Sequence, residues 1–539
     1  MNLIEETMDV VLIHPPVSKP CEPPAGIGRL AGMLRLHGID CTVIDANREI
    51  LLGCEIDAAA VQDTWTRRAE RHCRRHMSLL TQWSGYTDHA RYTRAVSDIN
   101  RVLDAAAKPA GASVSLADYQ ADGLSPVRSS DLLRSAEQPE RNPFYPYFSR
   151  RLAGVLDQIG PDLIGFSLNY LSQALCTFAM MGLLRRLDPR ARIVLGGSLV
   201  TSWTSRQGRI PRFAGLVDAV VSGPGEEPLV RLAGGWPATG RCLPDYASLF
   251  EAPYLAPGPI LPYSASSGCY WNRCTFCPER LEASGYAGRP PGEVIHELET
   301  LIERSDPILI HLLDNALSPA LLKALADHPL SAPWYGFARV TGELADPDFC
   351  RALRRSGCVM LQLGLESGDQ GVLDALDKGI RLEDVRKALA NLKASGVATY
   401  AYLLFGTPAE NRASAVRTMA FVRENAHLLD YLNLAVFNLP VASPEALSLD
   451  SFDFSEGDLS LYKGFIHPQG WDRGVVRQFL DKEFRRERAI AAILRRDPPV
   501  FTSNHAPLWV MARGRSDLEG KGAGTRPWGS GRHNRVKDV

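Results

Sequence analysis

The sequence predicts an α/β protein with an N-terminal doubly wound domain, a second domain that forms a partial (β/α)6 barrel, and a C-terminal helical cap. The first observation behind this prediction is that short apolar runs alternate with helix-like segments in two separate regions, near 8–225 and 261–440. The second is the length of 539 residues, which corresponds to three or four domains of roughly 150 residues. The third is a hydrophobic content of 45% with 22% charged residues, which is typical of a globular chain.

The N-terminal region begins with a strand, a helix and a second strand. Residues 10–14 form an apolar run that contains β-branched residues and closes with His14, and two prolines end it. Residues 27–37 carry apolar side chains at helical spacing before Gly38, and residues 41–44 return as a strand. A strand–helix–strand unit of this length predicts parallel pairing with a right-handed crossover.

The same alternation resumes near residue 150, with strands expected at 163–167, 193–195 and 219–221. Between the two parts, residues 52–140 form an expected helical insert. Its stretch at 64–76 carries five arginines and two histidines, which indicates either a solvated helix face or a docking surface for an acidic partner.

The second domain contains six strand-like runs that alternate with helices, which predicts a parallel sheet curled into an incomplete barrel. The expected strands are 261–266, 308–313, 334–339, 359–365, 398–405 and 432–437. The expected boundaries are 1–250 for the N-terminal domain, 251–445 for the barrel, 446–511 for the cap and 512–539 for a disordered tail. Within the cap, residues 475–494 are expected to form one amphipathic helix.

Composition excludes several classes of protein. The formal net charge of −1 gives no basic field for nucleic acid, so we expect no nucleic-acid partner. No apolar stretch approaches the roughly 18 residues of a membrane span, and the acidic N-terminus does not resemble a secretory signal. Eleven cysteines, thinly spread, do not form a disulfide framework, so we expect a cytoplasmic protein with reduced thiols.

Three cysteines lie within nine residues, in the segment SSGCYWNRCTFCPE just after the first expected barrel strand. They are Cys269, Cys274 and Cys277, and thiolates this close in sequence can converge on one metal centre. An iron–sulfur cluster held by three cysteines leaves one iron open to an outside ligand. Structural zinc, an electron-transfer cluster and simple core packing are the alternatives that the residues leave open.

This segment resembles the radical S-adenosylmethionine (SAM) superfamily. The resemblance implies that the three cysteines hold a 4Fe-4S cluster, and that reductive cleavage of SAM there starts radical chemistry. The sequence departs from the commonest family spacing, because four residues separate Cys269 from Cys274 instead of three.

Later segments also resemble the family. ILIHLLDN, LQLGLESGDQGVLDALDKG and YLLFGTPAE match motifs at the ends of its second, fourth and fifth barrel strands. For Arg339, after the third strand, a barrel-mouth ion pair is the alternative to SAM binding. The resemblance implies the following SAM-binding residues: Phe276, Asp314, Asn315, Arg339, Glu366, Ser367 and Gly406.

The N-terminal domain resembles that of the cobalamin-binding subgroup of the same superfamily, through residues 13–34, VLGGSLVT and VVSGPGEEP. The resemblance implies that cobalamin binds at Ser167, Gly196, Gly197 and Glu226. Glycines there would let the backbone lie against a large flat ligand. The Asp-x-His-x-x-Gly motif that supplies a cobalt ligand is absent, and His14 is interpreted as a strand-end residue. A domain that binds no cobalamin and serves as a scaffold is the alternative.

The expected function is cobalamin-dependent methyl transfer to a carbon or phosphorus atom of an unknown small-molecule or peptide substrate. Radical cyclisation or rearrangement is the alternative on the same scaffold, and a non-catalytic cluster module that binds a nucleotide is the alternative from another class. An electron donor such as flavodoxin or ferredoxin is the expected partner. No residue is assigned to acid–base catalysis: His505 of the cap is a polar group suited to it, but the favoured interpretation of His505 is a structural histidine.

Overall fold

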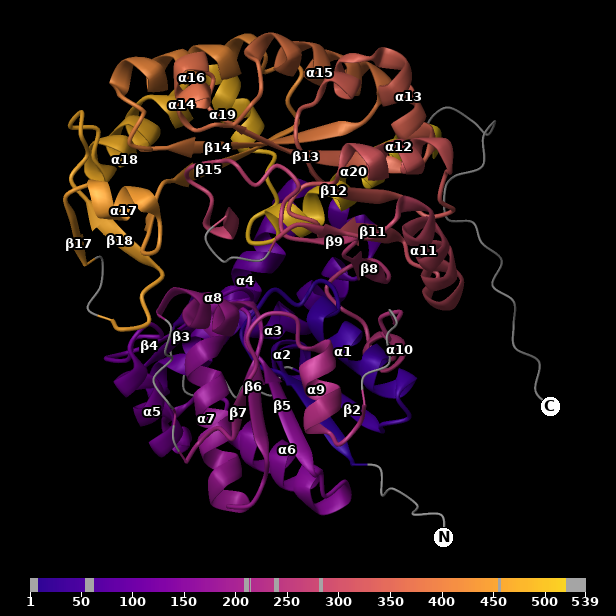
Figure 1. Cartoon of the computed structure of the whole chain (residues 1–539), viewed down its shortest axis with the longest axis vertical. Coiled ribbons are helices and arrows are strands. Elements are labelled where there is room, and N and C mark those ends of the chain that lie inside the picture. Colours follow the sequence, from indigo (N-terminus) through magenta and orange to yellow (C-terminus); the bar gives the residue numbers. More distant parts are fainter. Residues whose placement is uncertain are drawn as a thin grey trace.

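The computed structural model describes residues 8–53, 63–207, 213, 215–236, 242–280, 285–453 and 457–519. Its two main sheets are both parallel, which confirms the predicted α/β class. The sheet formed by the N-terminal part lies in the lower half of Figure 1, and the barrel sheet lies above it.

The N-terminal sheet has five parallel strands in the order β2-β1-β5-β6-β7. The chain moves outward from β1 to β2 and then returns past β1 to β5, so the direction of winding reverses between β1 and β5. Ligands of open parallel sheets bind outside the carboxyl ends of the strands at such a reversal. The strands are β1 (Val10–His14), β2 (Cys41–Asp45), β5 (Leu163–Ser167), β6 (Ile193–Gly196) and β7 (Ala219–Val220).

Both faces of this sheet are covered, because alternate side chains of β1 enter different cores. Val10 and Leu12 pack with α1 (Ala25–Leu36) and α9 (Glu226–Leu232) on one face. Val11 and Ile13 pack on the other face with α6 (Tyr145–Gln158) and α7 (Leu171–Leu187). All five residues of β1 are buried, which explains why its first four, Val10 to Ile13, are apolar without a break.

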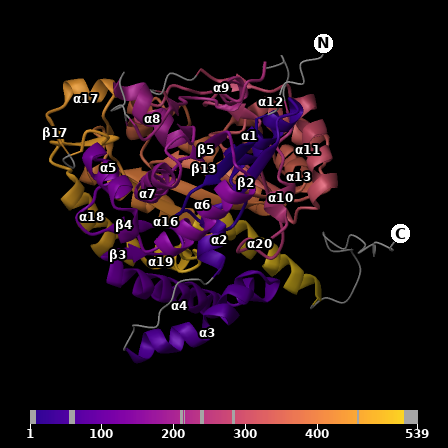
Figure 2. The same ribbon diagram turned by 90° about the horizontal axis from the view of Figure 1, so that it is seen from below.

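The described part of the insert between β2 and β5 is mostly helical. Residues 54–62 lie outside the described residues. The arginine-rich stretch forms α3 (Thr64–Leu80), which packs along α4 (His89–Ala107) on one side of the molecule (Figure 2). The insert also contains a two-stranded hairpin that the sequence did not predict, because its strands have only three residues each. Its other elements include α2 (Ala46–Gly53), β3 (Ala112–Val114), β4 (Tyr119–Ala121) and α5 (Ser129–Glu137).

The second sheet is the predicted partial barrel, with six parallel strands in the order β15-β14-β13-β12-β11-β8. Its outer face packs on α11 (Pro291–Ser305), α12 (Pro319–Asp327), α13 (Pro347–Arg355), α15 (Leu382–Ser395) and α16 (Arg412–Glu424). The strands are β8 (Ile260–Tyr263), β11 (Leu309–Leu312), β12 (Trp334–Ala338), β13 (Cys358–Glu366), β14 (Ala398–Phe405) and β15 (Tyr431–Val436).

The C-terminal region differs from the prediction in two ways. The single amphipathic helix expected at 475–494 is wrong: α18 (Arg473–Lys482) and α19 (Arg488–Leu494) are separate, because a short 3-10 turn between them buries Phe484. The disordered tail expected from residue 512 is also wrong at its start, because α20 (Thr502–Glu519) continues through this point. Residues 520–539 lie outside the described residues.

Helix α20 lies on the inner face of the barrel sheet and joins it to the insert. Its Phe501-to-Trp509 segment shares a core with Tyr335 and Tyr400 of the barrel and Tyr92 of α4. The His505 Nδ1 atom lies 2.7 Å from the Tyr92 hydroxyl, and burial lowers the pKa of His505 to about 3. His505 is therefore a packing residue, fully buried among the rings of Tyr86, Tyr92 and Phe501, in agreement with the structural interpretation.

No helix in the described part of the chain combines the length and the apolar character needed to cross a membrane.

Candidate functional site

The three clustered cysteines lie in one loop that follows β8 and the two-residue strand β9 (Ser266–Ser267). All three thiols are free, and Cys274 is the most buried of them. Among the described residues, no three His, Cys, Asp or Glu side chains are already gathered as a metal site. Three free thiols on one loop at the carboxyl edge of a barrel nevertheless form a suitable donor set for an iron–sulfur cluster.

Two cations lie beside Cys274. The Arg339 Nη1 atom is 3.8 Å from the Cys274 sulfur, and the charges of Arg339 and Lys378 both oppose the effect of burial, which raises the pKa of this thiol. Burial raises the pKa of Cys277 to about 11. The two cations would stabilise negative charge on a thiolate or on a cluster bound there.

Arg339 is not held by an ion pair, because no carboxylate pairs with it among the described residues. Its guanidinium carbon lies 4.2 Å from the centre of the Trp271 ring, and its Nη2 donates to the Lys378 carbonyl oxygen. The described residues thus provide no barrel-mouth ion pair for Arg339. Lys378 itself was missed in the sequence, where nothing in its local pattern distinguishes it from a surface lysine.

Glu366 and Ser367 follow one another at the end of β13 but have different surroundings. The Glu366 carboxylate accepts a hydrogen bond of 2.8 Å from the Lys378 ammonium. Ser367 is fully buried, and its hydroxyl lies 3.0 Å from the Thr418 hydroxyl. Phe276 lies near the same lysine, with the ammonium 5.7 Å from its ring centre.

Asp314 and Asn315 follow β11. One Asp314 oxygen accepts the Ala265 backbone N–H at 3.0 Å, and the other accepts the Ser266 hydroxyl. Asp314 therefore ties the end of the first barrel strand to the second, in addition to any contact with a ligand. Burial raises the pKa of its carboxyl group, while Asn315 is exposed.

Gly406, directly after β14, has a φ of +80°, a conformation that favours glycine. Its N–H donates to the carboxylate of Glu410, which also accepts the Trp471 indole N–H at 2.8 Å. Glu410 is almost fully buried, and burial raises its pKa to about 7. Glu410 thus positions the loop that carries Gly406.

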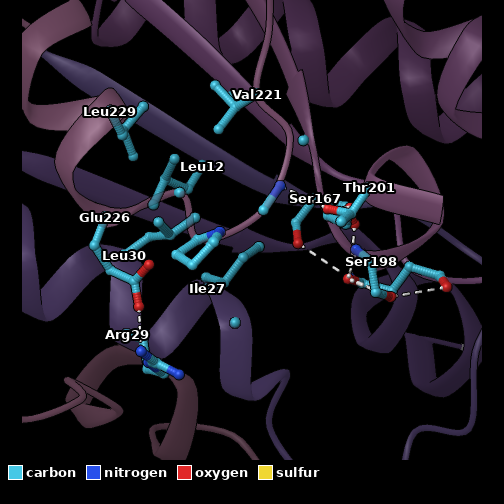
Figure 3. A pocket seen from close by; sticks show the side chains of 18 of the residues that line it. Leu12, Ile27, Arg29, Leu30, Ser167, Ser198, Thr201, Val221, Glu226 and Leu229 are labelled. Atoms are coloured by element: carbon cyan, nitrogen blue, oxygen red, sulfur yellow. Dashed lines mark hydrogen bonds and ion pairs between the residues drawn. The ribbon is translucent and has the colours of Figure 1, made fainter. Parts of the chain in front are cut away.

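A cavity of about 390 Å³, called the edge cavity here, lies at the carboxyl edge of the N-terminal sheet (Figure 3). Its walls come from β5, β6, α1 and α9, and Figure 3 shows the apolar side chains of Leu12, Ile27, Leu30, Val221 and Leu229 around it. Ser267, Gly268 and Glu279 of the cysteine loop also line it. The edge cavity therefore lies between the N-terminal sheet and the cysteine loop of the barrel.

All four residues expected at a cobalamin site line the edge cavity: Ser167, Gly196, Gly197 and Glu226. The Ser167 hydroxyl oxygen accepts the side-chain N–H of Asn169 at 3.1 Å, and Glu226 forms an ion pair with Arg29. The two glycines differ in how far the surrounding backbone itself requires them. A Cβ on Gly197, whose φ is +116°, would lie 2.3 Å from the Leu168 carbonyl oxygen, so this glycine is required by the backbone. A Cβ on Gly196 would make only ordinary contacts of 3.5 Å or more.

A second cavity of about 500 Å³, the central cavity, adjoins the edge cavity at Gly26, Asn169 and Ser198. It extends from the strand ends of the N-terminal sheet to the barrel residues Pro262, His311 and Leu313. In its wall, a Glu22 oxygen accepts hydrogen bonds from His311 Nδ1 at 2.8 Å and from the Asn504 side chain at 3.1 Å. Sequence reasoning missed this contact, because the three residues are hundreds of positions apart.

His14 also faces the central cavity. Its Nε2 atom lies 3.0 Å from the Ser18 hydroxyl, and burial lowers its pKa while the charge of Asp45 opposes this effect. His14 is thus placed as the strand-end residue that the sequence indicates.

Comparison with known proteins agrees with this geometry. Residues 263–422 match the radical SAM superfamily, and this segment contains the cysteine loop and strands β11 to β14. The chain therefore carries a radical SAM domain, for which a 4Fe-4S cluster and SAM are the implied cofactors.

Two curated relatives match more distantly. The chain is 24% identical over 291 residues to the anaerobic magnesium-protoporphyrin IX monomethyl ester cyclase of Rubrivivax gelatinosus. The aligned region covers 50% of this chain and 48% of that protein. The chain is 23% identical over 311 residues to the uncharacterized methyltransferase PH0819 of Pyrococcus horikoshii. This aligned region covers 51% of this chain and 66% of that protein. The chain thus spans about half to two thirds of the length of these relatives.

A solved structure shows the same fold over nearly the whole chain. It is the radical SAM methyltransferase TsrM from Kitasatospora setae with tryptophan substrate and the SAM analog aza-SAM bound, with a TM-score of 0.55, 15% identity, and coverage of 96% of this chain and 99% of that one. The same enzyme with cobalamin and a 4Fe-4S cluster bound gives a TM-score of 0.51 and 15% identity, and covers 82% of this chain and 78% of that one. At this identity the likeness shows the fold.

Proposed function

We propose that this protein is a cobalamin-dependent radical SAM methyltransferase. The observation that carries the proposal is the edge cavity, which the carboxyl edge of the doubly wound sheet and the cysteine loop of the barrel line together. A ligand of the N-terminal sheet would therefore lie next to a ligand of the cysteine loop. Cobalamin in the structure of TsrM from Kitasatospora setae supports this choice of ligand.

In this proposal, Cys269, Cys274 and Cys277 hold a 4Fe-4S cluster, and SAM binds at the neighbouring strand ends. Such a cluster, when bound, supplies the electron that cleaves SAM, and cobalamin, when bound, carries the methyl group. Arg339 and Lys378 stabilise negative charge at Cys274. The proposed SAM-binding residues all lie within or near the cysteine loop or directly at the carboxyl ends of barrel strands, where the ligands of such barrels bind.

The glycine-lined wall of the edge cavity is suited to a large ligand with a flat or extended part. A Cβ on Gly26 would have only the Ser167 hydroxyl within 4 Å, at 3.9 Å, and one on Gly196 would also be free of steric conflict. Space that these glycines leave open lets a ligand approach the backbone. The apolar residues of β1, α1 and α9 would exclude water from it.

Cyclisation is the second candidate, because the relative from Rubrivivax gelatinosus is named a cyclase. The products formed from SAM distinguish methyl transfer from cyclisation. A cobalamin-dependent radical methyltransferase that removes a hydrogen atom from its substrate consumes two SAM molecules per turnover, and forms S-adenosylhomocysteine and 5′-deoxyadenosine in about equal amounts. A cyclase on the same scaffold forms only the second product. An electron donor such as flavodoxin or ferredoxin would reduce the cluster in either case.

The test begins with anaerobic reconstitution of the full chain with iron, sulfide and cobalamin. We expect about four irons per chain, retained cobalamin and slow formation of 5′-deoxyadenosine from SAM even without substrate. Each of the changes Cys269→Ala, Cys274→Ala and Cys277→Ala should abolish the cluster absorption, and Cys41→Ala is the matched control. Stoichiometric zinc in a colourless protein would contradict the proposal.

A further inference from the structure

The four residues between Cys269 and Cys274 form a loop that is held against a segment far along the chain. This inter-cysteine loop is Tyr270, Trp271, Asn272 and Arg273, and the segment that it contacts is Asp377, Lys378 and Gly379, here called the seat. The seat lies just after α14 (Gln370–Ala375), about 105 residues from the loop.

Trp271 makes the main contact. Its indole N–H donates to the Asp377 carbonyl oxygen at 2.9 Å. The ring lies so close to Gly379 that a Cβ there would be 2.1 Å from the ring atom Cζ2, and the φ of Gly379 is +66°. The seat therefore needs glycine at 379 both for its backbone conformation and for the tryptophan ring.

The residues on both sides of Cys274 are also tied to this region. Arg273 donates from Nε to the Asp377 carboxylate at 3.0 Å. The backbone N–H of Thr275 donates to the Leu376 carbonyl oxygen at 3.1 Å. Because both of its neighbours are held by hydrogen bonds, the backbone position of Cys274 is set by Leu376 and the seat.

The seat also connects to the cations beside the cysteine. Arg339, whose guanidinium lies against Trp271, donates to the Lys378 carbonyl oxygen, while the Lys378 side chain pairs with Glu366. The centre of the Trp271 ring thus lies 4.2 Å from the guanidinium carbon of Arg339 and 4.9 Å from that of Arg273. Both distances are within cation–π range.

Asn272 is the residue that lets the loop fit. It is exposed and has a φ of +43°, a left-handed conformation that asparagine tolerates better than most residues. One residue spans at most about 3.5 Å of chain. Without it, the loop would lose the length that allows Trp271 to reach the seat while Cys269 and Cys274 stay in place.

We infer that the four-residue spacing is fitted to this seat, and that Trp271 is a positioning residue for the cluster ligand Cys274. The inference rests on the proposed function, because it assumes that a cluster binds to the three cysteines. It adds that the unusual loop length is required in this chain and that shortening the loop to three residues would harm the site.

The experiment compares Trp271→Ala, Trp271→Phe, deletion of Asn272 and Asn272→Gly in the full-length protein, with Trp236→Ala as the matched control, since Trp236 is 84% exposed. Iron and sulfide per chain and the electron paramagnetic resonance spectrum of the reduced cluster are measured. We expect Trp271→Ala to lower cluster retention about 3-fold to 10-fold, the factor that corresponds to one lost hydrogen bond. Deletion of Asn272 should lower it further and change the spectrum.

Trp271→Phe, which keeps a ring against Arg339, should recover part of the loss, while Asn272→Gly and Trp236→Ala should match the wild type. Wild-type cluster content and spectrum in the deletion variant would overturn the inference.

A second measurement does not depend on the cluster. Hydrogen exchange of the Thr275 amide in the iron-free protein should become faster in Trp271→Ala and in the deletion variant. Unchanged exchange would overturn the docking of the loop. If exchange becomes faster but the wild type takes up no cluster, the proposed function fails and the docking of the loop stands.

Discussion

The Lys378 ammonium lies 2.8 Å from the Glu366 carboxylate, with side chains only 7% and 12% exposed. This buried pair joins the end of β13 to the seat of the inter-cysteine loop. Both residues therefore connect the proposed SAM site with the cysteine loop.

The first prediction concerns this pair. Lys378→Met should destabilise the protein by about 3–5 kcal/mol, because it leaves the buried Glu366 carboxylate without its partner. Lys378→Met combined with Glu366→Gln should recover much of the loss. The measurement is urea unfolding at pH 7. Lys387→Met is the control, since Lys387 and Glu383 form an exposed pair, and equal effects at the two lysines would contradict the prediction.

The second prediction concerns Asp314. Asp314→Ala should destabilise the barrel by about 1–3 kcal/mol, because the buried Ala265 N–H loses its acceptor. Weak SAM binding in this variant would then not by itself identify Asp314 as a SAM ligand. Ser266→Ala removes only the neighbouring hydroxyl donor and should weaken the fold less. Calorimetric SAM titration alongside thermal unfolding separates the two roles, and unchanged stability of Asp314→Ala would contradict the structural one.

The third prediction separates the two glycines of the edge cavity. Gly196→Val should leave the fold intact but lower cobalamin retention, because its side chain would extend into the cavity from a position with ordinary Cβ contacts. Gly197→Ala should destabilise the N-terminal domain with or without cobalamin, because its Cβ meets the Leu168 backbone. Absorbance of retained cobalamin and thermal unfolding give the two readouts. Full cobalamin retention in Gly196→Val would place the ligand elsewhere.

The fourth prediction is a pH dependence. The pKa of Glu410 is about 7 in the folded protein, against 4.5 as its ordinary value, chiefly because of burial. The folded state therefore binds the proton more tightly, and this contribution to stability is complete below pH 4.5 and is lost as the pH rises to 7. Its size is about 3 kcal/mol.

Glu410→Gln removes this titration and keeps an oxygen acceptor for Gly406 and Trp471. The stability of the wild type relative to this variant should therefore fall by about 3 kcal/mol between pH 4.5 and pH 8. Urea unfolding of both proteins across this range is the measurement. A constant difference would mean that the carboxyl group titrates normally in the folded protein.

Local sequence features were sufficient for the architecture. Residues 10–13 are apolar at every position, and this pattern predicts a strand buried on both faces because no other placement covers all four side chains. The six barrel strands were placed for the same reason, within a few residues of their ends. The cysteine loop was found because its three thiols are close in sequence, and local spacing is visible without a fold.

The seat of the inter-cysteine loop and the wall of the central cavity were decided only by the tertiary structure. Asp377 and Gly379 have no motif that links them to Trp271. The Glu22 carboxylate meets His311 and Asn504 only because the segment after β1, the end of β11 and the start of α20 line the same cavity. The sequence by itself determined which segments form strands and helices and which loop carries the thiols, because apolar periodicity and short spacings are local properties. Only the tertiary structure decided which charges and rings surround those thiols, because such contacts depend on how distant segments pack.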